Sequence, residues 1–311
     1  MYYNSFSAAM VRQFGEKVYK LSLDGGFTCP NRDGTLGTGG CIFCSGSGSG
    51  DFAARRGDNI AEQLEAAKAR VAGKYRGGKY IAYFQSFTNT YAPAEKLEAI
   101  FTPVLERPEI VAMSIATRPD CLENEKIRLL QDMNRKKPVW VELGLQTVNE
   151  ETARYIRRGY ELPVFDDAMR RLKAAGLEVI VHMILGLPGE SAEDMYRTAA
   201  YIGQSGANGI KLQLLHILRG TDLAAEYLSG KFRVLEEEEY LELLMGCLCR
   251  LPPEMVIHRL TGDGAKKDLI APLWSANKKQ VLSDLQRMFE AHDLTQGSLQ
   301  GGISQRLPLE G

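Results

Sequence analysis

The stretch LEVIVHMILGLPGESAEDMYRTAAYIGQSG (177–206) decides the fold, because it contains one complete strand–turn–helix unit. Its first part, 177–187, is mostly apolar at both odd and even positions, as in a strand that is buried on both faces of a sheet. Ser191 then precedes a segment with helical periodicity, and serine is a favoured residue at the N-cap of a helix. The stretch therefore predicts a βα unit.

The same unit recurs along the chain. Further strands are predicted at 17–23, 79–87, 109–118, 138–147 and 209–218. Further helices are predicted at 59–73, 93–106, 124–136, 149–158, 163–175 and 235–251. Six or seven βα units in succession favour a parallel sheet with helices outside it, whereas a closed barrel would need eight. We therefore predict the α/β class: a partial (β/α)6 TIM-type barrel with parallel strands and a short C-terminal extension.

The end of the chain departs from this pattern. The segment PEMVIHRLTGDG (253–264) has the character of a seventh strand, and 275–293 is predicted to form a terminal helix. Residues 294–311 carry little periodicity, and part of this tail is expected to be disordered. We expect a barrel domain at 1–260 and an extension at 261–311.

Composition limits the class of protein. The 311 residues carry a formal net charge of −1, so the surface as a whole should not attract nucleic acid or membrane. The chain contains no run of 18 apolar residues, which predicts no membrane span. Its start lacks the charged and apolar regions of a secretory signal. We therefore expect a cytoplasmic protein, with its cysteines reduced.

A cluster of cysteines lies on one glycine-rich loop, CPNRDGTLGTGGCIFC (29–44). The loop follows the first predicted strand, and chemistry in such barrels occurs at the C-terminal ends of the strands. Cys29, Cys41 and Cys44 have the spacing C-x11-C-x2-C. Cysteine thiolates hold iron–sulfur clusters, and three of them leave one iron of a [4Fe–4S] cluster open to a further ligand.

A structural zinc site is the alternative for this loop. Zinc in such sites has four ligands, and the candidates for a fourth are Cys121 and His182. The spacing of the cysteines alone leaves both metals open.

Four motifs in a fixed order resemble the radical S-adenosylmethionine (SAM) superfamily. They are CIFC (41–44), ATRPDCL (116–122), VELGLQTVNEETARYIRRGY (141–160) and HMILGLPGE (182–190). Phe43 precedes the last cysteine, as an aromatic residue does in that superfamily. The cysteine spacing is longer than the familiar C-x3-C-x2-C and resembles the branch related to the catalytic subunit of Elongator. Stand-alone bacterial proteins of this branch, implicated in the processing of wobble uridines in tRNA, are the most similar.

The resemblance implies an activity and its cofactors. Cys29, Cys41 and Cys44 would hold a [4Fe–4S] cluster, and SAM would bind the open iron. Cleavage of SAM would yield a 5′-deoxyadenosyl radical that acts on a modified wobble uridine of tRNA. A reducing electron donor such as flavodoxin or ferredoxin would be required. The Elongator subunit also carries an acetyltransferase domain, and we do not expect one within these 311 residues.

The resemblance also implies where SAM is held. The segment QSFTNTY (85–91) stands where the superfamily has a Gly-Gly-Glu-type sequence that meets the amino group of SAM. Arg118 at a strand end suits a carboxylate, and Glu142 and Gln146 fall on one face of a strand. Gly186 permits close approach of a ligand to the backbone. The predicted cofactor-binding residues are Gln85, Ser86, Thr88, Asn89, Thr117, Arg118, Glu142, Gln146, His182, Gly186 and Leu187.

Each of these residues also has a plainer interpretation. The polar loop after the second strand is equally typical of a solvated loop. Arg118 could pair with Asp120, and Glu142 could pair with a core arginine such as Arg118. A lone histidine on a strand is more often a satisfied core residue. His182 and His216 are the candidates for a catalytic residue, and neither is assigned that role.

Two other functions remain open at this point. One is a radical SAM enzyme that acts on a small molecule, and the other is a non-catalytic, zinc-bearing protein that binds RNA. Any tRNA would be bound through local basic segments, although each segment alone is more often solvated surface. These segments are RRGDN (55–59), NRKKP (134–138), RYIRRGY (154–160) and AKKD (265–268).

Overall fold

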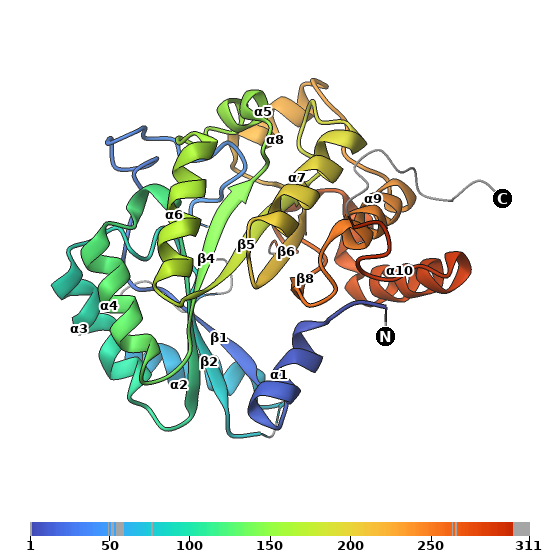
Figure 1. The fold of residues 1–311 in the computed structure, drawn as a ribbon. Coiled ribbons are helices and arrows are strands. Elements are labelled where there is room, and N and C mark those ends of the chain that lie inside the picture. The colour runs from blue at the N-terminus through green and yellow to red at the C-terminus, as the bar shows by residue number, and fades with distance from the viewer. Residues whose placement is uncertain are drawn as a thin grey trace. The chain divides into compact units, whose positions relative to one another are not determined.

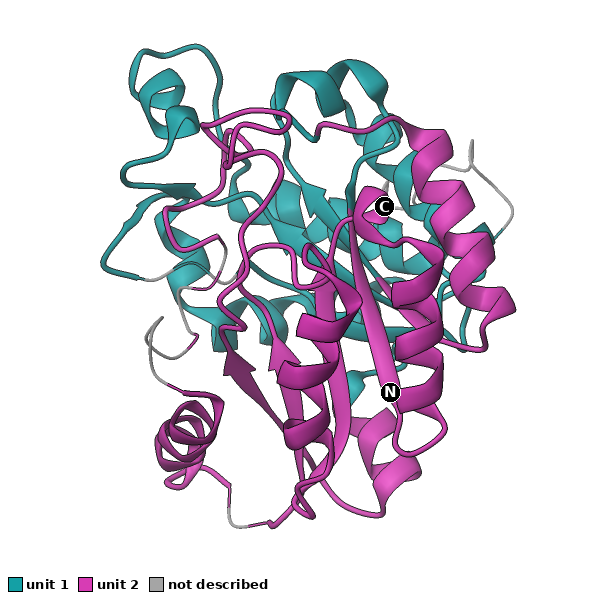
Figure 2. Ribbon diagram, turned by 90° about the vertical axis from the view of Figure 1, so that its left-hand side faces the viewer, with its two compact units in different colours: residues 1–6, 145–158, 181–311 teal, residues 7–144, 159–180 magenta. Residues whose placement is uncertain are grey.

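The computed structural model forms two compact units, which Figure 2 shows in different colours. It describes residues 2–48, 50, 53, 59–75, 77–262, 264 and 266–300. Unit 1 comprises Met1–Phe6, Leu145–Arg158 and Val181–Gly311, and unit 2 comprises Ser7–Gly144 and Gly159–Ile180. The predicted division of the chain near residue 260 stays a prediction, and residues 301–311 of the expected tail lie outside the described residues.

A seven-stranded sheet runs through the fold in the order β1-β2-β3-β4-β5-β6-β8 (Figure 1). Its strands are β1 Tyr19–Leu23, β2 Tyr80–Phe84, β3 Ile110–Thr117, β4 Val139–Gln146, β5 Glu178–Leu185, β6 Gly209–Leu214 and β8 Val256–Arg259. The pairs β1–β2, β2–β3, β3–β4 and β6–β8 are parallel. Parallel strands in chain order, joined by helices, make this a partial TIM-type barrel and confirm the predicted α/β class. The seventh strand expected within 253–264 is β8.

Helices follow most strands. They are α1 Phe6–Phe14, α2 Ile60–Val71, α3 Ala94–Leu105, α4 Asn124–Asn134, α5 Glu150–Tyr155, α6 Leu162–Ala174, α7 Ala192–Gln204, α8 Asp222–Leu228, α9 Glu237–Arg250 and α10 Lys278–His292. The short 3-10 helices are η1 Pro119–Cys121 and η2 Leu273–Ala276. Ser191 caps α7 as predicted. Asp194 completes a capping box, because its carboxylate accepts a hydrogen bond from the Ser191 main-chain N–H. No helix in the described part of the chain combines the length and the apolar character needed to cross a bilayer.

The core of unit 2 anchors the cysteine loop. Every residue of β2 is buried, and Phe84 at its end packs against Phe101 of α3 with ring centroids 4.7 Å apart. Phe27, at the start of the cysteine loop, is 2% exposed and packs on the same Phe101 ring at 6.1 Å. The loop therefore leaves β1 with one aromatic side chain fixed in the core.

Unit 1 departs from the prediction at its sixth strand. Residues 209–218 were predicted as one strand, but β6 ends at Leu214, and β7 (Ile217–Leu218) belongs to a second sheet with the antiparallel strand β9 (Leu269–Ala271). The Leu215 amide donates to the Leu185 carbonyl at 2.9 Å, which turns the chain out of the strand. The apolar run alone did not reveal this break.

Candidate functional site

The three cysteines of the loop are free thiols in unit 2, and all three are half-buried. The Cys44 amide donates to the Cys41 carbonyl at 2.9 Å, so the C-x2-C segment forms a tight turn. The Arg32 amide donates to the Cys29 carbonyl at 2.8 Å, which begins a second turn at the other cysteine. In the described part of the chain, no three His, Cys, Asp or Glu side chains converge as the ligands of a single ion would.

The Arg32 side chain is hydrogen-bonded to the C-terminal end of the C-x2-C turn, a role that the sequence did not reveal. Its guanidinium donates to the carbonyls of Cys44 and Ser45 at 3.0 and 2.7 Å. Gly40 has a φ of +74°, and a Cβ there would lie 2.8 Å from Arg32 Nε. The left-handed backbone conformation therefore favours glycine at position 40, and a Cβ there would displace the Arg32 guanidinium.

Asn31 contacts the middle cysteine. Its side-chain Nδ2 donates to Cys41 Sγ at 3.4 Å, and the residue is 5% exposed. Burial, followed by the nearby charge of Cys44, raises the pKa of the Cys41 thiol to about 12, although Asn31 and Arg118 oppose this effect. In the absence of a metal the Cys41 thiol is therefore protonated at neutral pH, and a metal ion that binds this sulfur must displace the proton.

Arg118 extends from the end of β3 and pairs with Asp120. Its Nε and Nη2 donate to the two carboxylate oxygens at 2.9 and 2.7 Å. Burial lowers the pKa of Arg118, but Asp120 and the charges of Cys29 and Cys41 outweigh it, so the pKa lies above its ordinary value. The ion pair with Asp120 was the plainer interpretation of this residue, and it is present.

Glu142 of β4 is fully buried, and its partner is a lysine. Its Oε1 accepts from Lys20 Nζ at 2.8 Å and from Ser114 Oγ at 2.5 Å. Lys20 also lies 4.9 Å from the centre of the Tyr83 ring. The ion pairs observed within unit 2 are thus Lys20 with Glu142 and Arg118 with Asp120.

The polar loop after β2 is buried, so its interpretation as a solvated loop is wrong. Ser86, Thr88, Asn89 and Thr90 are each at most 1% exposed. Asn89 Nδ2 donates to the carbonyls of Phe84 and Ala116 at 3.1 and 2.9 Å. Asn89 Oδ1 and Ser86 Oγ are buried and have no hydrogen-bond partner among the residues described. Buried oxygens of this kind are typical of a site that a donor on a ligand completes.

Thr117 and Gln85, two further residues that were predicted to bind the cofactor, also lie in unit 2. Thr117 of β3 lies 2.6 Å from Thr90, oxygen to oxygen, and Thr90 also donates to the Cys121 carbonyl at 2.5 Å. Thr117 thus ties the β2 loop to the end of β3. Gln85 is half-buried, and its main-chain N–H donates to the Leu23 carbonyl at 3.2 Å.

The remaining predicted cofactor residues belong to unit 1. Gln146 ends β4 with a φ of +70°, and within the described chain its buried Oε1 has no partner. His182 on β5 is half-buried. Gly186 follows β5 with a φ of +85°, and Leu187 begins a tight turn in which the Glu190 amide donates to its carbonyl at 3.2 Å.

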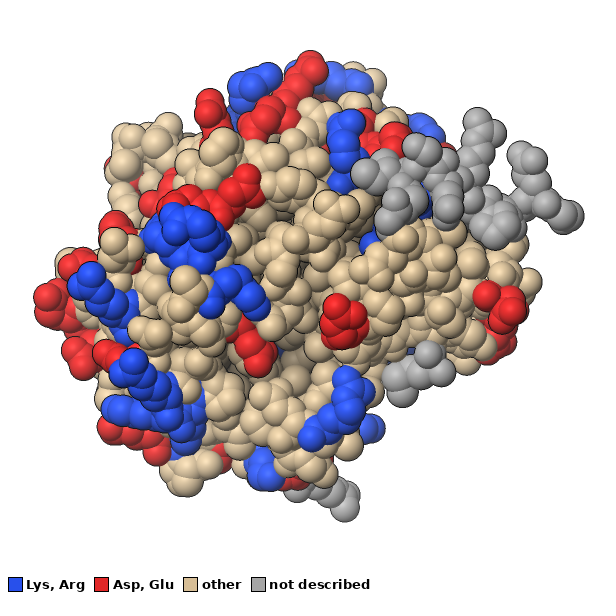
Figure 3. All heavy atoms as spheres, viewed as in Figure 1, with Lys and Arg blue, Asp and Glu red and all other residues tan. Residues whose placement is uncertain are grey.

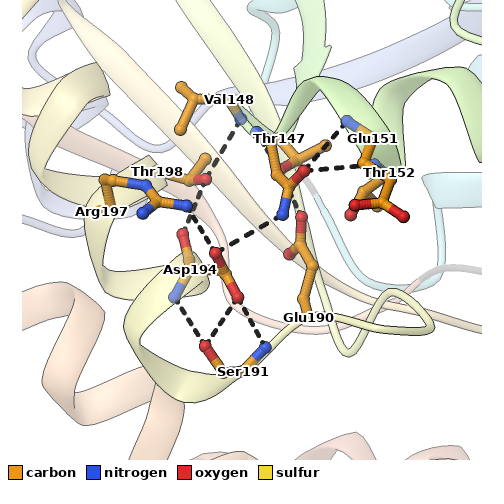
Figure 4. Close-up of polar contacts among 10 residues, drawn as sticks. Thr147, Val148, Glu151, Thr152, Glu190, Ser191, Asp194, Arg197 and Thr198 are labelled. Carbon is orange, nitrogen blue, oxygen red and sulfur yellow. Dashed lines mark hydrogen bonds and ion pairs between the residues drawn. The ribbon is translucent and has the colours of Figure 1, made fainter.

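Glu190 lies in a polar network that the sequence did not reveal (Figure 4). Thr147, which follows β4, donates to Glu190 Oε1, and Glu190 Oε2 is buried without a partner among the described residues. Burial raises the pKa of the Glu190 carboxyl to about 7, partly offset by Thr147. Asn149 Nδ2 also donates to Asp194 Oδ1 at 3.5 Å, so the loops after β4 and β5 are held together.

His216 lies between β6 and β7, also in unit 1. Its Nδ1 accepts from the Gly264 amide at 3.1 Å, so the neutral imidazole carries its proton on Nε2. A Cβ on Gly262 would lie 2.3 Å from that Nε2 atom. The loop after β8 therefore packs directly on the ring and fixes its orientation.

Comparison with known families identifies the chain. Residues 32–202, more than half of the chain, match the Radical SAM superfamily. The chain belongs to the radical SAM superfamily. Residues 207–291 match the Radical_SAM C-terminal domain. The superfamily match includes Cys41 and Cys44 but begins three residues after Cys29.

Relatives place this radical SAM enzyme in the branch related to Elongator complex protein 3. It is 44% identical to the uncharacterized protein YtqA of Bacillus subtilis over 308 residues, 99% of this chain and 94% of that protein. It is 27% identical to Elongator complex protein 3 of Schizosaccharomyces pombe over 202 residues, which cover 60% of this chain but 36% of that protein. The solved archaeal Elp3 of Methanocaldococcus infernus has the same fold, with a TM-score of 0.67 at 18% identity, over 90% of this chain and 64% of that one.

The cofactors of a radical SAM enzyme are a [4Fe–4S] cluster and SAM, and the residues present suit both. The cysteine loop offers three free thiols, a side-chain N–H aimed at one sulfur, and a nearby guanidinium that favours negative charge. The β2 loop offers two buried oxygens that can accept hydrogen bonds. Family membership also sets aside the zinc-bearing, non-catalytic alternative.

Proposed function

We propose that Cys29, Cys41 and Cys44 hold the [4Fe–4S] cluster of this radical SAM enzyme. The single observation that carries the assignment is the loop itself, with three free thiols and a tight turn at C-x2-C. When bound, the cluster and SAM would supply the one-electron reductive cleavage of SAM that is typical of radical SAM enzymes. The chain's own residues orient the two cofactors and exclude water from them.

Cys29 gives the sharpest test of this assignment, because the superfamily match begins after it. We expect Cys29→Ser to lower the iron content of the reconstituted protein well below that of the wild type. Cys121→Ser is the matched control, since Cys121 is a buried cysteine of the same unit whose thiol lies against Asp120. Full iron in Cys29→Ser, or iron lost only in Cys121→Ser, would refute the assignment.

We further propose that the buried oxygens of the β2 loop accept hydrogen bonds from the ammonium group of SAM. Asn89 is fixed by two carbonyls through its Nδ2, which leaves Oδ1 as the acceptor. A buried polar atom without a partner costs about 1 to 3 kcal/mol, and a ligand that donates to it recovers this free energy. Ser86→Ala should therefore weaken SAM binding without loss of iron, as measured by equilibrium dialysis against labelled SAM. Unchanged affinity would remove Ser86 from the site.

We propose a modified wobble uridine of tRNA as the substrate. The relationship to Elongator complex protein 3 supports this choice, because the sequence resemblance to that branch implies action on wobble uridines of tRNA. A base in a single-stranded anticodon loop can be splayed out into a site at the strand ends. A small-molecule substrate is the remaining alternative.

A group of exposed basic side chains beside the β7–β9 pair supports an RNA substrate. The β7–β9 pairing brings two segments together, and the Arg219 amide donates to the Asp268 carbonyl at 2.8 Å. Arg219, Lys266 and Lys267 are exposed there, and their side chains have no acidic partner within the described chain. On the face shown in Figure 3, basic and acidic side chains are interspersed. We propose that these three cations contact tRNA phosphates.

The basic segments named from the sequence differ in whether their cations are paired with acidic side chains. Arg135 pairs with Asp132 at 2.9 Å, and the buried Arg158 pairs with Glu150, also at 2.9 Å. Arg55 and Arg56 lie outside the described residues. Among the residues that the structure describes, Lys266 and Lys267 of the segment AKKD thus form no ion pair with a carboxylate.

Salt dependence of tRNA binding tests this proposal. Replacing Arg219, Lys266 and Lys267 with alanine should reduce the slope of log K against log salt by about 3. The control triple variant removes exposed arginines that each pair with an aspartate, namely Arg135, Arg170 and Arg287. Equal slopes in both triple variants would refute the role of these cations, and a wild-type protein that binds no tRNA would favour the small-molecule alternative.

A further inference from the structure

One buried side chain in the cysteine loop, that of Asn31, contacts a cysteine without being a metal ligand itself. Residues 33–36 between the first two cysteines are exposed, whereas Asn31 is 5% exposed. Burying a carboxamide is costly unless its N–H and C=O groups find partners. Its contacts therefore indicate why an asparagine stands at this position.

Asn31 is held on three sides within unit 2. Its Nδ2 donates to Cys41 Sγ at 3.4 Å, and its main-chain carbonyl accepts from the Gly40 amide at 2.7 Å. On the opposite side lies Gly159, where an added Cβ would be 2.6 Å from Asn31 Oδ1 and 3.1 Å from Arg118 Nη2. Gly159 also has a φ of +83°, so both its conformation and the space available require glycine. The carboxamide is thus enclosed between one cysteine sulfur and one glycine.

We propose that Asn31 is a positioning residue that sets the reduction potential of the cluster through its N–H···S bond to Cys41. The inference rests on the proposed role of Cys41 as a cluster ligand. Reduction adds one electron to the cluster, whose core charge falls from 2+ to 1+, and negative charge on the ligand sulfurs increases. An N–H donor stabilises the more negative state, so its loss must lower the potential. Gly159 keeps the donor in place by leaving room for Oδ1.

The test is a redox titration of the reconstituted protein with dithionite, followed by electron paramagnetic resonance of the reduced cluster. Asn31→Leu keeps the approximate shape of the side chain and removes the donor. We expect the equilibrium constant for cluster reduction to fall about tenfold, which is 59 mV for a one-electron couple. Asn31→Asp, which replaces the donor with a carboxylate oxygen, should lower the potential further. Iron content should stay at the wild-type level in both variants.

Two variants separate the hydrogen bond from general effects on the loop. Asp33→Asn changes an exposed charge in the same loop and keeps the side-chain oxygen that accepts from the Thr35 amide. Because solvent screens that charge, the reduction potential of the cluster in Asp33→Asn should stay close to that of the wild type. Gly159→Ala leaves Asn31 in the sequence but pushes a Cβ against its Oδ1, so this variant should also lower the potential.

The outcomes distinguish the two levels of the proposal. If Asn31→Leu holds full iron at the potential of Asp33→Asn, the role of Asn31 is wrong. If Asn31→Leu loses iron, Gly159→Ala decides: a wild-type potential in that variant overturns the inference, and a lowered one supports it. If Cys41→Ser keeps full iron, the ligand assignment itself fails, whatever the Asn31 variants show.

Discussion

Glu190 allows a quantitative prediction, because burial places its ionisation in an experimentally accessible pH range. The carboxyl pKa rises from 4.5 to about 7 in the folded protein. At 1.36 kcal/mol for each pH unit, this difference amounts to about 3 kcal/mol. A raised folded pKa means that the contribution to stability is fully present below pH 4.5 and is lost as the pH rises through 7. The cause is desolvation of the charged form, which Thr147, Thr152 and Arg197 only partly offset.

Glu190→Gln removes this dependence on pH. The glutamine oxygen can still accept from Thr147, and the side chain remains neutral at every pH. Relative to the wild type, the variant should gain about 2.5 kcal/mol of unfolding free energy between pH 5 and pH 8. We expect the two proteins to differ little at pH 5 and the variant to be the more stable at pH 8.

Urea unfolding at the two pH values, followed by tryptophan fluorescence, measures this difference. Glu193→Gln is the matched control, because Glu193 is exposed in the first turn of the same helix, α7. That control should shift the urea midpoint equally at both pH values. If Glu190→Gln also gives the same shift at pH 5 and pH 8, the reasoning from its burial is refuted.

Three further predictions follow from the described contacts. Lys20→Met leaves the fully buried Glu142 without its cation and should cost about 3 to 5 kcal/mol of unfolding free energy, measured by urea unfolding. Adding Glu142→Gln to Lys20→Met should restore much of that loss, and a double variant as unstable as the single one would argue against the pair. Ser191→Ala removes the N-cap of α7 and should lower stability by about 1 kcal/mol, with Ser191→Thr close to wild type. Arg32→Ala should speed amide hydrogen exchange in the C-x2-C turn, because two carbonyls lose their donor; unchanged exchange would remove Arg32 from that role.

The fold could be predicted from the sequence because strand burial and helix periodicity are local properties. The run at 177–187 and the cap at Ser191 each lie within one element, and both were predicted correctly. The break between β6 and β7 was missed, since it depends on pairing with β9 about fifty residues later, which no local pattern reports.

Partners of buried polar groups were harder to predict. Lys20 and Glu142 are 122 residues apart in sequence, and they lie on β1 and β4, which are not neighbours in the sheet. A lysine within the apolar strand 17–23 was the available signal, since a buried ammonium requires a partner. The Asn31–Cys41 bond had no such signal, because the loop conformation depends on Gly40 and on packing against Gly159.

The central claim is that the cysteine loop carries a cluster that cleaves SAM and that tRNA is the substrate. One anaerobic experiment tests both parts: reconstitution with iron and sulfide, reduction with dithionite, and measurement of 5′-deoxyadenosine with and without tRNA. We predict about four iron per chain, release of 5′-deoxyadenosine, and a higher rate when tRNA is present. Iron without any 5′-deoxyadenosine would contradict the radical SAM assignment, and release that tRNA leaves unchanged would contradict the choice of substrate.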